Sequence, residues 1–168
     1  MLPDSLARAR ALLENVTPLH ADCGLSCGHA CCRSLEGELS GMLLFPGEDA
    51  YYADLPDYRT VDTADGPLLI CPGRCARGDR PLSCRLMPLL PLLRPDGIKV
   101  ATDLRAKGVC PLARMGKDAL DPAFVEAVRE VGRILVEDEA QRTFLERLTA
   151  QQDELKALRN QFRRGSHV

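Results

Sequence analysis

The chain has 168 residues, the size of one ordinary domain with room for an appended helical element. Hydrophobic residues make up 45% of it, enough for a core, but only 4% are aromatic and tryptophan is absent, so aliphatic side chains must do most of the packing. The formal net charge of -2 argues against a protein whose main task is to bind phosphate groups, and we expect no nucleic-acid partner.

The N-terminal segment predicts a helix over residues 4–15, which Asp4 or Ser5 is suited to cap. Its apolar stripe is supplied by three leucines, Leu6, Leu12 and Leu13. The segment carries too many charges for a secretory leader, and the longest apolar stretch, 87–93, is short and broken by two prolines. We therefore expect a cytoplasmic protein with no membrane partner, in a compartment where thiols are kept reduced.

The middle of the chain predicts short elements separated by turns. Residues 20–34 carry the first cysteines and two glycines, so we expect a few helical turns there at most. An apolar run, a Pro-Gly break and a short helix follow over 41–54, and the apolar run 66–71 predicts a short buried strand. Residues 72–97 are rich in proline and glycine and predict an irregular loop, whereas a turn signal ahead of 97–102 predicts a paired strand.

The last part of the chain has a different character. Asp121 and Pro122 suit the N-cap and first position of a helix. Apolar residues then recur at helical spacing over 122–163, with charges on the other faces. This pattern predicts one or two long amphipathic helices, broken near Gly132 or near residues 137–139.

Together these elements predict an α+β fold: a small irregular cysteine-rich metal-binding core with short strands, followed by one or two long C-terminal α-helices. We expect a cysteine-cluster metal-binding domain over 1–120 and an amphipathic helical extension over 121–168 that packs on it. The alternative use of the extension is as a site for a protein partner.

The cysteines are the most informative feature of the sequence. They occur as C-G-L-S-C-G-H-A-C-C, as C-P-G-R-C and as two later residues, and we predict that all of them ligate metal. The eight are Cys23, Cys27, Cys31, Cys32, Cys71, Cys75, Cys84 and Cys110. Neighbouring Gly and Pro let the backbone turn tightly around a small object, and the C-x3-C spacing is within the range used for chelation. Because thiolates repel one another, a cation must lie among them, and we expect zinc or iron, the latter also as an iron–sulfur cluster.

Three other readings of the cysteines stay open. They are disulfides in an exported protein, a thiol redox relay built on the adjacent pair Cys31 and Cys32, and buried cysteines with no shared role. The radical-type iron–sulfur motif C-x3-C-x2-C is excluded, because Ala30 occupies the position of its third cysteine. His29 and His20 are further candidate ligands, although a histidine beside glycine in a turn more often caps or solvates it.

Arginines accompany the second group of cysteines. The stretch 71–85 has four arginines against one aspartate, and cations near thiols favour the thiolate. Arg74 and Arg77 could equally well solvate a loop.

These motifs resemble the YkgJ-like cysteine-cluster family, described as a zinc- or iron-chelating domain. That family has a leading C-x2-C-x2-C-C cluster and, later, a cysteine pair followed by R-P-x-x-C-R-x-x-P. Residues 80–88 of this chain read R-P-L-S-C-R-L-M-P, whereas its leading cluster has x3 spacings and keeps the terminal doublet. The resemblance covers residues 20–112 and implies structured roles for Arg80 and Arg85. Similar clusters occur in flagellin lysine methylases, but nothing here matches a methyl-donor site.

The expected function is thus that of a metal-binding cysteine-cluster protein whose cellular role the sequence does not define. The alternative is an iron–sulfur-dependent redox or group-transfer enzyme. No catalytic residue is assigned, because the sequence shows neither a phosphate-binding glycine-rich loop nor a Ser/His/Asp set.

Overall fold

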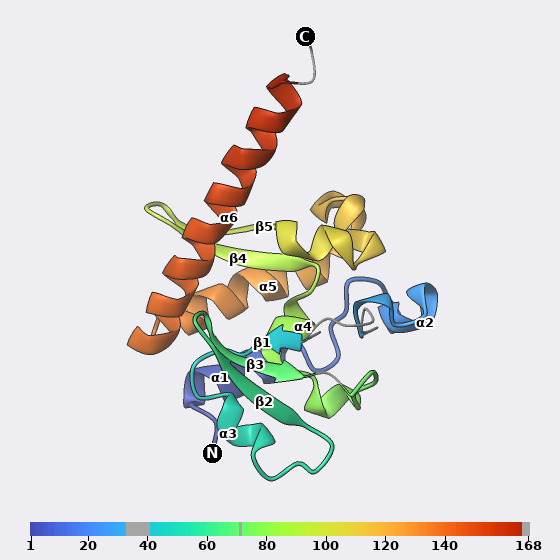
Figure 1. The fold of residues 1–168 in the computed structure, drawn as a ribbon, viewed down its shortest axis with the longest axis vertical. Coiled ribbons are helices and arrows are strands. Elements are labelled where there is room, and N and C mark those ends of the chain that lie inside the picture. The colour runs from blue at the N-terminus through green and yellow to red at the C-terminus, as the bar shows by residue number, and fades with distance from the viewer. Residues whose placement is uncertain (33–40, 71, 166–168) are drawn as a thin grey trace.

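The computed structural model of the protein describes residues 1–32, 41–70 and 72–165 (Figure 1). Helices and antiparallel strands occur together in one chain, which confirms the α+β class. In chain order the elements are α1 Asp4–Leu12, α2 Cys23–Cys27, β1 Gly41–Leu43, α3 Asp49–Tyr52, β2 Arg59–Thr63, β3 Gly66–Ile70, α4 Leu82–Leu86, β4 Leu89–Arg94, β5 Gly97–Thr102, α5 Pro122–Leu135 and α6 Glu139–Gly165. Short 3-10 helices span Ala30–Cys32, Arg77–Asp79, Leu104–Gly108, Pro111–Arg114 and Lys117–Ala119.

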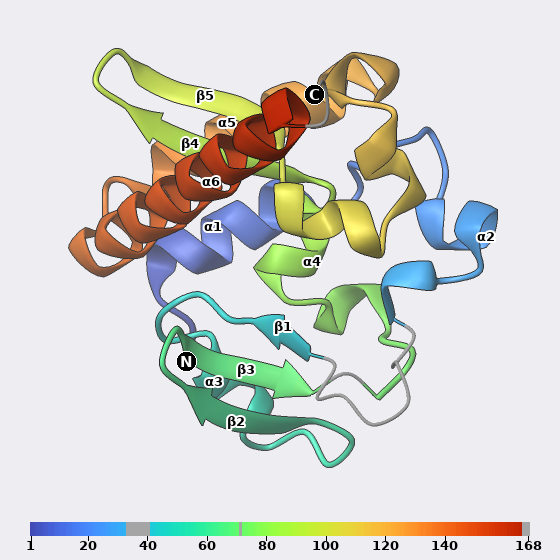
Figure 2. The ribbon, with the colours of Figure 1, turned by 45° about the horizontal axis from the view of Figure 1, so that its top comes forward.

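The strands form two small antiparallel sheets on different sides of α1 and α4 (Figure 2). One sheet has the order β1-β3-β2, so β3 is central, and Ile70 faces Gly41 on one side and Arg59 on the other. The other sheet is the hairpin β4-β5, which turns between Arg94 and Gly97. Gly97 has a φ of 116°, a conformation that glycine adopts readily, and the predicted strand 97–102 is confirmed.

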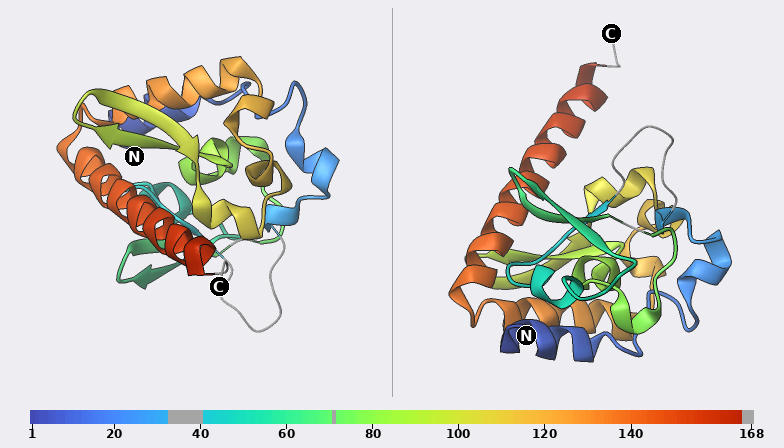
Figure 3. Two further views of the ribbon diagram at one scale, coloured as in Figure 1. Left: turned by 90° about the horizontal axis from the view of Figure 1, so that it is seen from above. Right: turned by 60° about the horizontal axis from the view of Figure 1, so that its bottom comes forward.

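The main hydrophobic core lies between α1, α4, β4, α5 and α6. Helix α5 places four apolar residues of one face in it, and it runs beside α1 (Figure 3). These residues are Phe124, Val128, Val131 and Leu135. The hairpin approaches α5 at Gly132, where a Cβ atom would lie 2.7 Å from Ile98 Cγ2. One core cluster therefore joins residues from both sides of position 121, while the two-domain division stays a prediction.

The two C-terminal helices are confirmed, with their break at residues 136–138. The Asp121 carboxylate caps α5 by accepting a hydrogen bond from the Ala123 backbone N–H at 2.9 Å, and Pro122 occupies the first turn. Beyond the core, α6 extends away from the rest of the molecule, and its last apolar side chains are exposed (Figure 1). Over the described ranges 1–32, 41–70 and 72–165, no helix has the length and apolar character that would let it cross a membrane.

The prediction of an irregular loop over 72–97 is wrong in its second half. This range contains α4 and the strand β4, whose apolar residues are largely buried. Proline at position 91 suggested a loop, but among the described residues β4 pairs with β5 alone, and a strand paired on one side tolerates a residue without an N–H. Strand β2 was not predicted, because its sequence R-T-V-D-T is polar and has no apolar run. In the structure most of its residues are exposed.

Helix α1 also differs in detail from expectation. Pro3 is its N-cap residue and no side chain caps it, so neither Asp4 nor Ser5 acts as the cap. Leu6 and Leu13 are buried, but Leu12 is 38% exposed and does not belong to the buried stripe. The buried face of α1 instead includes Arg10.

Candidate metal centre

The seven cysteines that the structure describes line a single cavity of about 50 Å³. They come from widely separated segments and are Cys23, Cys27, Cys31, Cys32, Cys75, Cys84 and Cys110. Predicted ligand Cys71 lies outside the described residues. A volume of 10–15 Å³ already holds one water molecule, so there is room for a metal ion.

The first four of these thiols reach the cavity through a tight turn. Helix α2 is capped by Asp22, whose carboxylate accepts a hydrogen bond from the Gly24 backbone N–H at 3.1 Å. It ends at Gly28 in the left-handed conformation, and His29 follows with a φ of 56°. The 3-10 helix Ala30–Cys32 then carries the adjacent thiols, so the chain reverses between the two pairs of cysteines instead of forming one long helix.

The histidines differ in their placement. His29 lines the cavity, and a Cβ atom on Gly24 would lie 2.5 Å from His29 Nδ1, so a glycine is needed where the imidazole rests on α2. His20 does not line the cavity; its side chain is 92% exposed, and Nδ1 lies 3.2 Å from Asp121 Oδ2. Of the two histidines that the structure describes, His29 is therefore the one placed to join the thiols as a ligand.

The other three thiols arrive on different elements. Cys75 precedes the 3-10 helix Arg77–Asp79, and Cys84 lies within α4. Cys110 lies between two further 3-10 helices and is buried beside Ala106 and Ala113. The cavity thus forms where four parts of the chain meet.

In the described part of the chain, no group of three or more Cys, His, Asp or Glu side chains is arranged so that it could directly hold a metal ion. Among the same residues, no two cysteines are joined by a disulfide. The thiols share an enclosure without converging on one point. The donor set still fits the expected metals in its chemistry, because soft thiolate and imidazole ligands select zinc and iron–sulfur clusters.

The adjacent cysteines Cys31 and Cys32 are joined by a hydrogen bond between their side chains. A hydrogen bond from the Cys31 thiol lowers the pKa of Cys32 to about 6, against the opposing effect of burial, and the positive charge of Arg80 lowers it further. The same hydrogen bond, followed by burial, raises the pKa of Cys31. The two pKa values of the pair therefore move apart, lower for Cys32 and higher for Cys31.

Two further thiols, Cys23 and Cys75, are less easily ionised than an ordinary cysteine. Burial raises the pKa of Cys23, and the nearby charges of Asp22, Cys27 and Cys110 act in the same direction. Burial also raises the pKa of Cys75, although a hydrogen bond with the Tyr58 hydroxyl opposes this shift. Each added thiolate makes the next less favourable, which is the electrostatic situation that a bound cation relieves.

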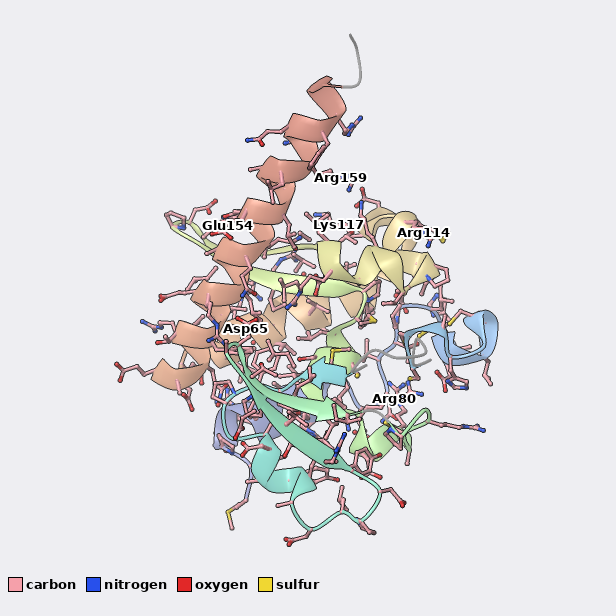
Figure 4. The ribbon with its side chains drawn as sticks, in the orientation of Figure 1. Asp65, Arg80, Arg114, Lys117, Glu154 and Arg159 are labelled. Carbon is pink, nitrogen blue, oxygen red and sulfur yellow. The ribbon has the colours of Figure 1, made fainter. Side chains whose placement is uncertain are left out.

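Arg80, labelled in Figure 4, is a cation that lines the cavity. Its half-buried guanidinium forms an ion pair with Asp22 at 3.5 Å and interacts electrostatically with Cys23 and Cys32. The expected structured role of Arg80 is thereby confirmed.

Arg85 binds the segment that leads from Cys75 to Cys84. Its side chain is only 4% exposed, and it donates hydrogen bonds to the backbone carbonyls of several residues as well as to the Glu14 carboxylate. The carbonyls belong to Arg10, Arg77, Gly78 and Arg80. Arg77 is also structured, since it donates to the Leu13 and Glu14 carbonyls, so it does not merely solvate a loop.

A buried ion pair behind the cavity was not predicted. Glu48 is fully buried; it accepts a hydrogen bond from Arg10 at 2.9 Å and one from the Leu82 backbone N–H at 2.7 Å, at the start of α4. Burial raises the pKa of Glu48, which the hydrogen bonds and the charge of Arg10 oppose. A signal was present for Arg10, because it lies at helical spacing between Leu6 and Leu13, on the apolar face of α1.

Comparison with known proteins adds nothing to this geometry: no family model, no curated protein and no solved structure matches the chain. The resemblance to the YkgJ-like family therefore remains a prediction based on the cysteine and arginine motifs.

Proposed function

We propose that this chain is a metal-binding cysteine-cluster protein that holds zinc or iron, the latter as an ion or as an iron–sulfur cluster. One observation carries the proposal: all seven described cysteines, from four parts of the chain, line the same small cavity. Random placement of cysteines in a fold would not produce this arrangement.

The exposure of the cysteines argues against a purely apolar role. Only Cys110 is buried, whereas Cys31 is exposed and the other five are partly exposed. Thiols that served only as small core residues would be buried as Leu82 and Leu86 are. The seven cysteines thus gather at a common enclosure, and six of them keep some contact with solvent, which leaves sulfur donors accessible to a metal ion.

The surroundings suit an anionic metal–thiolate centre. The positive charge of Arg80 offsets part of the excess negative charge of several thiolates. Arg85 binds the Gly78 carbonyl in the segment after Cys75, and Glu48, paired with Arg10, accepts from the Leu82 N–H at the start of the helix that carries Cys84. These contacts keep the two segments at a defined separation. A structural zinc site contributes an apparent ~10–16 kcal/mol at neutral pH, which would join these loop-borne segments firmly.

The test is elemental analysis of protein purified without oxygen, together with a count of reactive thiols before and after metal removal. We expect stoichiometric zinc or iron and thiols that become reactive only when the metal is removed. Brown protein with charge-transfer absorption indicates an iron–sulfur cluster, on which the enzyme alternative depends. Colourless protein with zinc indicates a structural or metal-handling role.

Matched variants locate the site. Cys23→Ser should lower the metal content, whereas His20→Ala should leave it unchanged, because His20 does not line the cavity. The proposal fails if protein prepared without air is folded and metal-free, with its sulfurs joined in disulfides.

A further inference from the structure

A second and larger cavity lies directly beside the one lined by cysteines. Its volume is about 350 Å³, and it shares Cys31, Cys32 and Met87 with the smaller cavity. Most of the remaining wall is apolar and comes from β1, α4, β4 and the residues next to them. The wall includes Met42, Leu43, Phe45, Leu68, Leu86 and Leu90.

Apart from the two shared thiols, the polar side chains in the described part of this wall are paired within the protein. The Arg105 guanidinium donates to both carboxylate oxygens of Asp103, at 3.0 and 2.8 Å, so the two charges cancel each other. The Ser83 hydroxyl donates to the Leu43 carbonyl at 2.6 Å. An anionic ligand would therefore find no unpaired cation among the described residues of this wall and would lose its hydration without compensation.

The size of the cavity is that of a small-molecule site, since such sites usually occupy about 300–1,000 Å³ and are mostly apolar with a few polar groups. We propose that this cavity binds a neutral, apolar small molecule and places it against the Cys31–Cys32 side of the metal centre. The position beside a metal rests on the proposed function, whereas the binding of an apolar molecule does not.

The binding test uses N-phenyl-1-naphthylamine, a neutral fluorescent probe, and its anionic analogue 8-anilino-1-naphthalenesulfonate. We expect the neutral probe to bind saturably with one molecule per chain and the sulfonate to bind at least about tenfold more weakly, because a buried charge is costly. Equal affinity for the two probes would refute the preference for a neutral ligand. Folded protein that shows no saturable binding, for example because residues of the chain already fill the space, would refute the site itself.

A pair of variants places the probe. Val109 lines the cavity and is 42% exposed, so Val109→Trp adds bulk at the wall with little risk to the core. Met115 is 64% exposed and does not line the cavity, so Met115→Trp is the matched control. We expect the affinity for the neutral probe to fall about tenfold in Val109→Trp and to stay within about twofold in Met115→Trp. Similar affinities in the two variants, with native circular dichroism, would mean that the probe binds elsewhere.

A final arm separates this inference from the proposed function. The titration is repeated on metal-free protein and on protein loaded with Co²⁺, whose visible absorption reports on its thiolate ligands. Saturation with the probe should shift the cobalt bands, and an unchanged spectrum would refute the position beside the metal. If the protein binds no metal at all, the proposed function fails, while probe binding and the Val109→Trp variant still decide whether the cavity is a ligand site.

Discussion

Replacement of Arg85 by lysine tests how the segment between Cys75 and Cys84 is held in place. The Arg85 guanidinium uses its planar array of donors on five acceptors: four backbone carbonyls and the Glu14 carboxylate. Lysine keeps the positive charge but has three donors at a single point, so it cannot reach carbonyls on both sides of the fork.

The expected loss of stability follows from the hydrogen bonds that lysine does not replace. Three of the carbonyls keep a second donor, because Arg10 O also accepts from the Leu13 N–H, Arg77 O from the Arg80 N–H, and Gly78 O from the Arg10 guanidinium. The Arg80 carbonyl loses its Arg85 donor at a cost of about 1–3 kcal/mol if it is left unsatisfied, and each of the other lost bonds costs about 0.5–1.5 kcal/mol. Loss of the pair with Glu14 adds little, because that carboxylate is 45% exposed and an exposed ion pair contributes about 0–1 kcal/mol. We therefore expect the free energy of unfolding to fall by about 3 kcal/mol.

Urea denaturation of the metal-free and metal-loaded protein measures this change. Arg105→Lys is the control, because within the described part of the chain the Arg105 side chain pairs with Asp103 alone and is 40% exposed, so we expect a change of less than about 0.5 kcal/mol. If the proposed metal site is correct, Arg85→Lys should also release metal faster to a chelator, since three of the four carbonyls belong to the segment that joins the proposed ligands Cys75 and Cys84. A stability of Arg85→Lys within about 0.5 kcal/mol of the unmodified protein would refute the reasoning.

Three further predictions address separate parts of the molecule. Cys84→Ser should lower the metal content measured by elemental analysis, and full retention would remove Cys84 from the ligand set. Gly132→Ala should lower the free energy of unfolding by about 1–3 kcal/mol in a denaturant titration, because its Cβ would lie 2.7 Å from Ile98; an unchanged midpoint would contradict this packing. Asp153→Asn removes a two-point ion pair with Arg94, at 2.7 Å for each bond. Arg94 lowers the pKa of Asp153, so the ion pair stabilises the folded protein by about 0.5 kcal/mol above the ordinary aspartate pKa of about 3.9. This stabilisation disappears as the pH falls through the lowered pKa of Asp153. A loss of stability in Asp153→Asn that persists in acid would contradict this prediction.

Features that depend on neighbouring residues could be predicted from the sequence. The helical spacing of Phe124, Val128 and Val131, preceded by Asp121, was sufficient for α5, because a helix buries one face and needs a cap at its start. The turn ahead of Gly97 likewise predicted β5. The chemical character of the centre, a group of soft sulfur donors, also follows from the sequence alone.

Features that depend on distant residues were decided only by the tertiary structure. Strand β4 tolerates Pro91 because, in the described part of the chain, its other edge has no strand partner. No local sequence pattern reveals that a strand will lie at the edge of a sheet. Glu48 is an ordinary acidic residue in the sequence, yet in the fold it receives Arg10 and the first N–H of α4. The cysteine motifs indicated a metal, but only the packing of four separate parts of the chain brought Cys110 to the same cavity as Cys23, because contacts across such separations arise from the burial of the whole core.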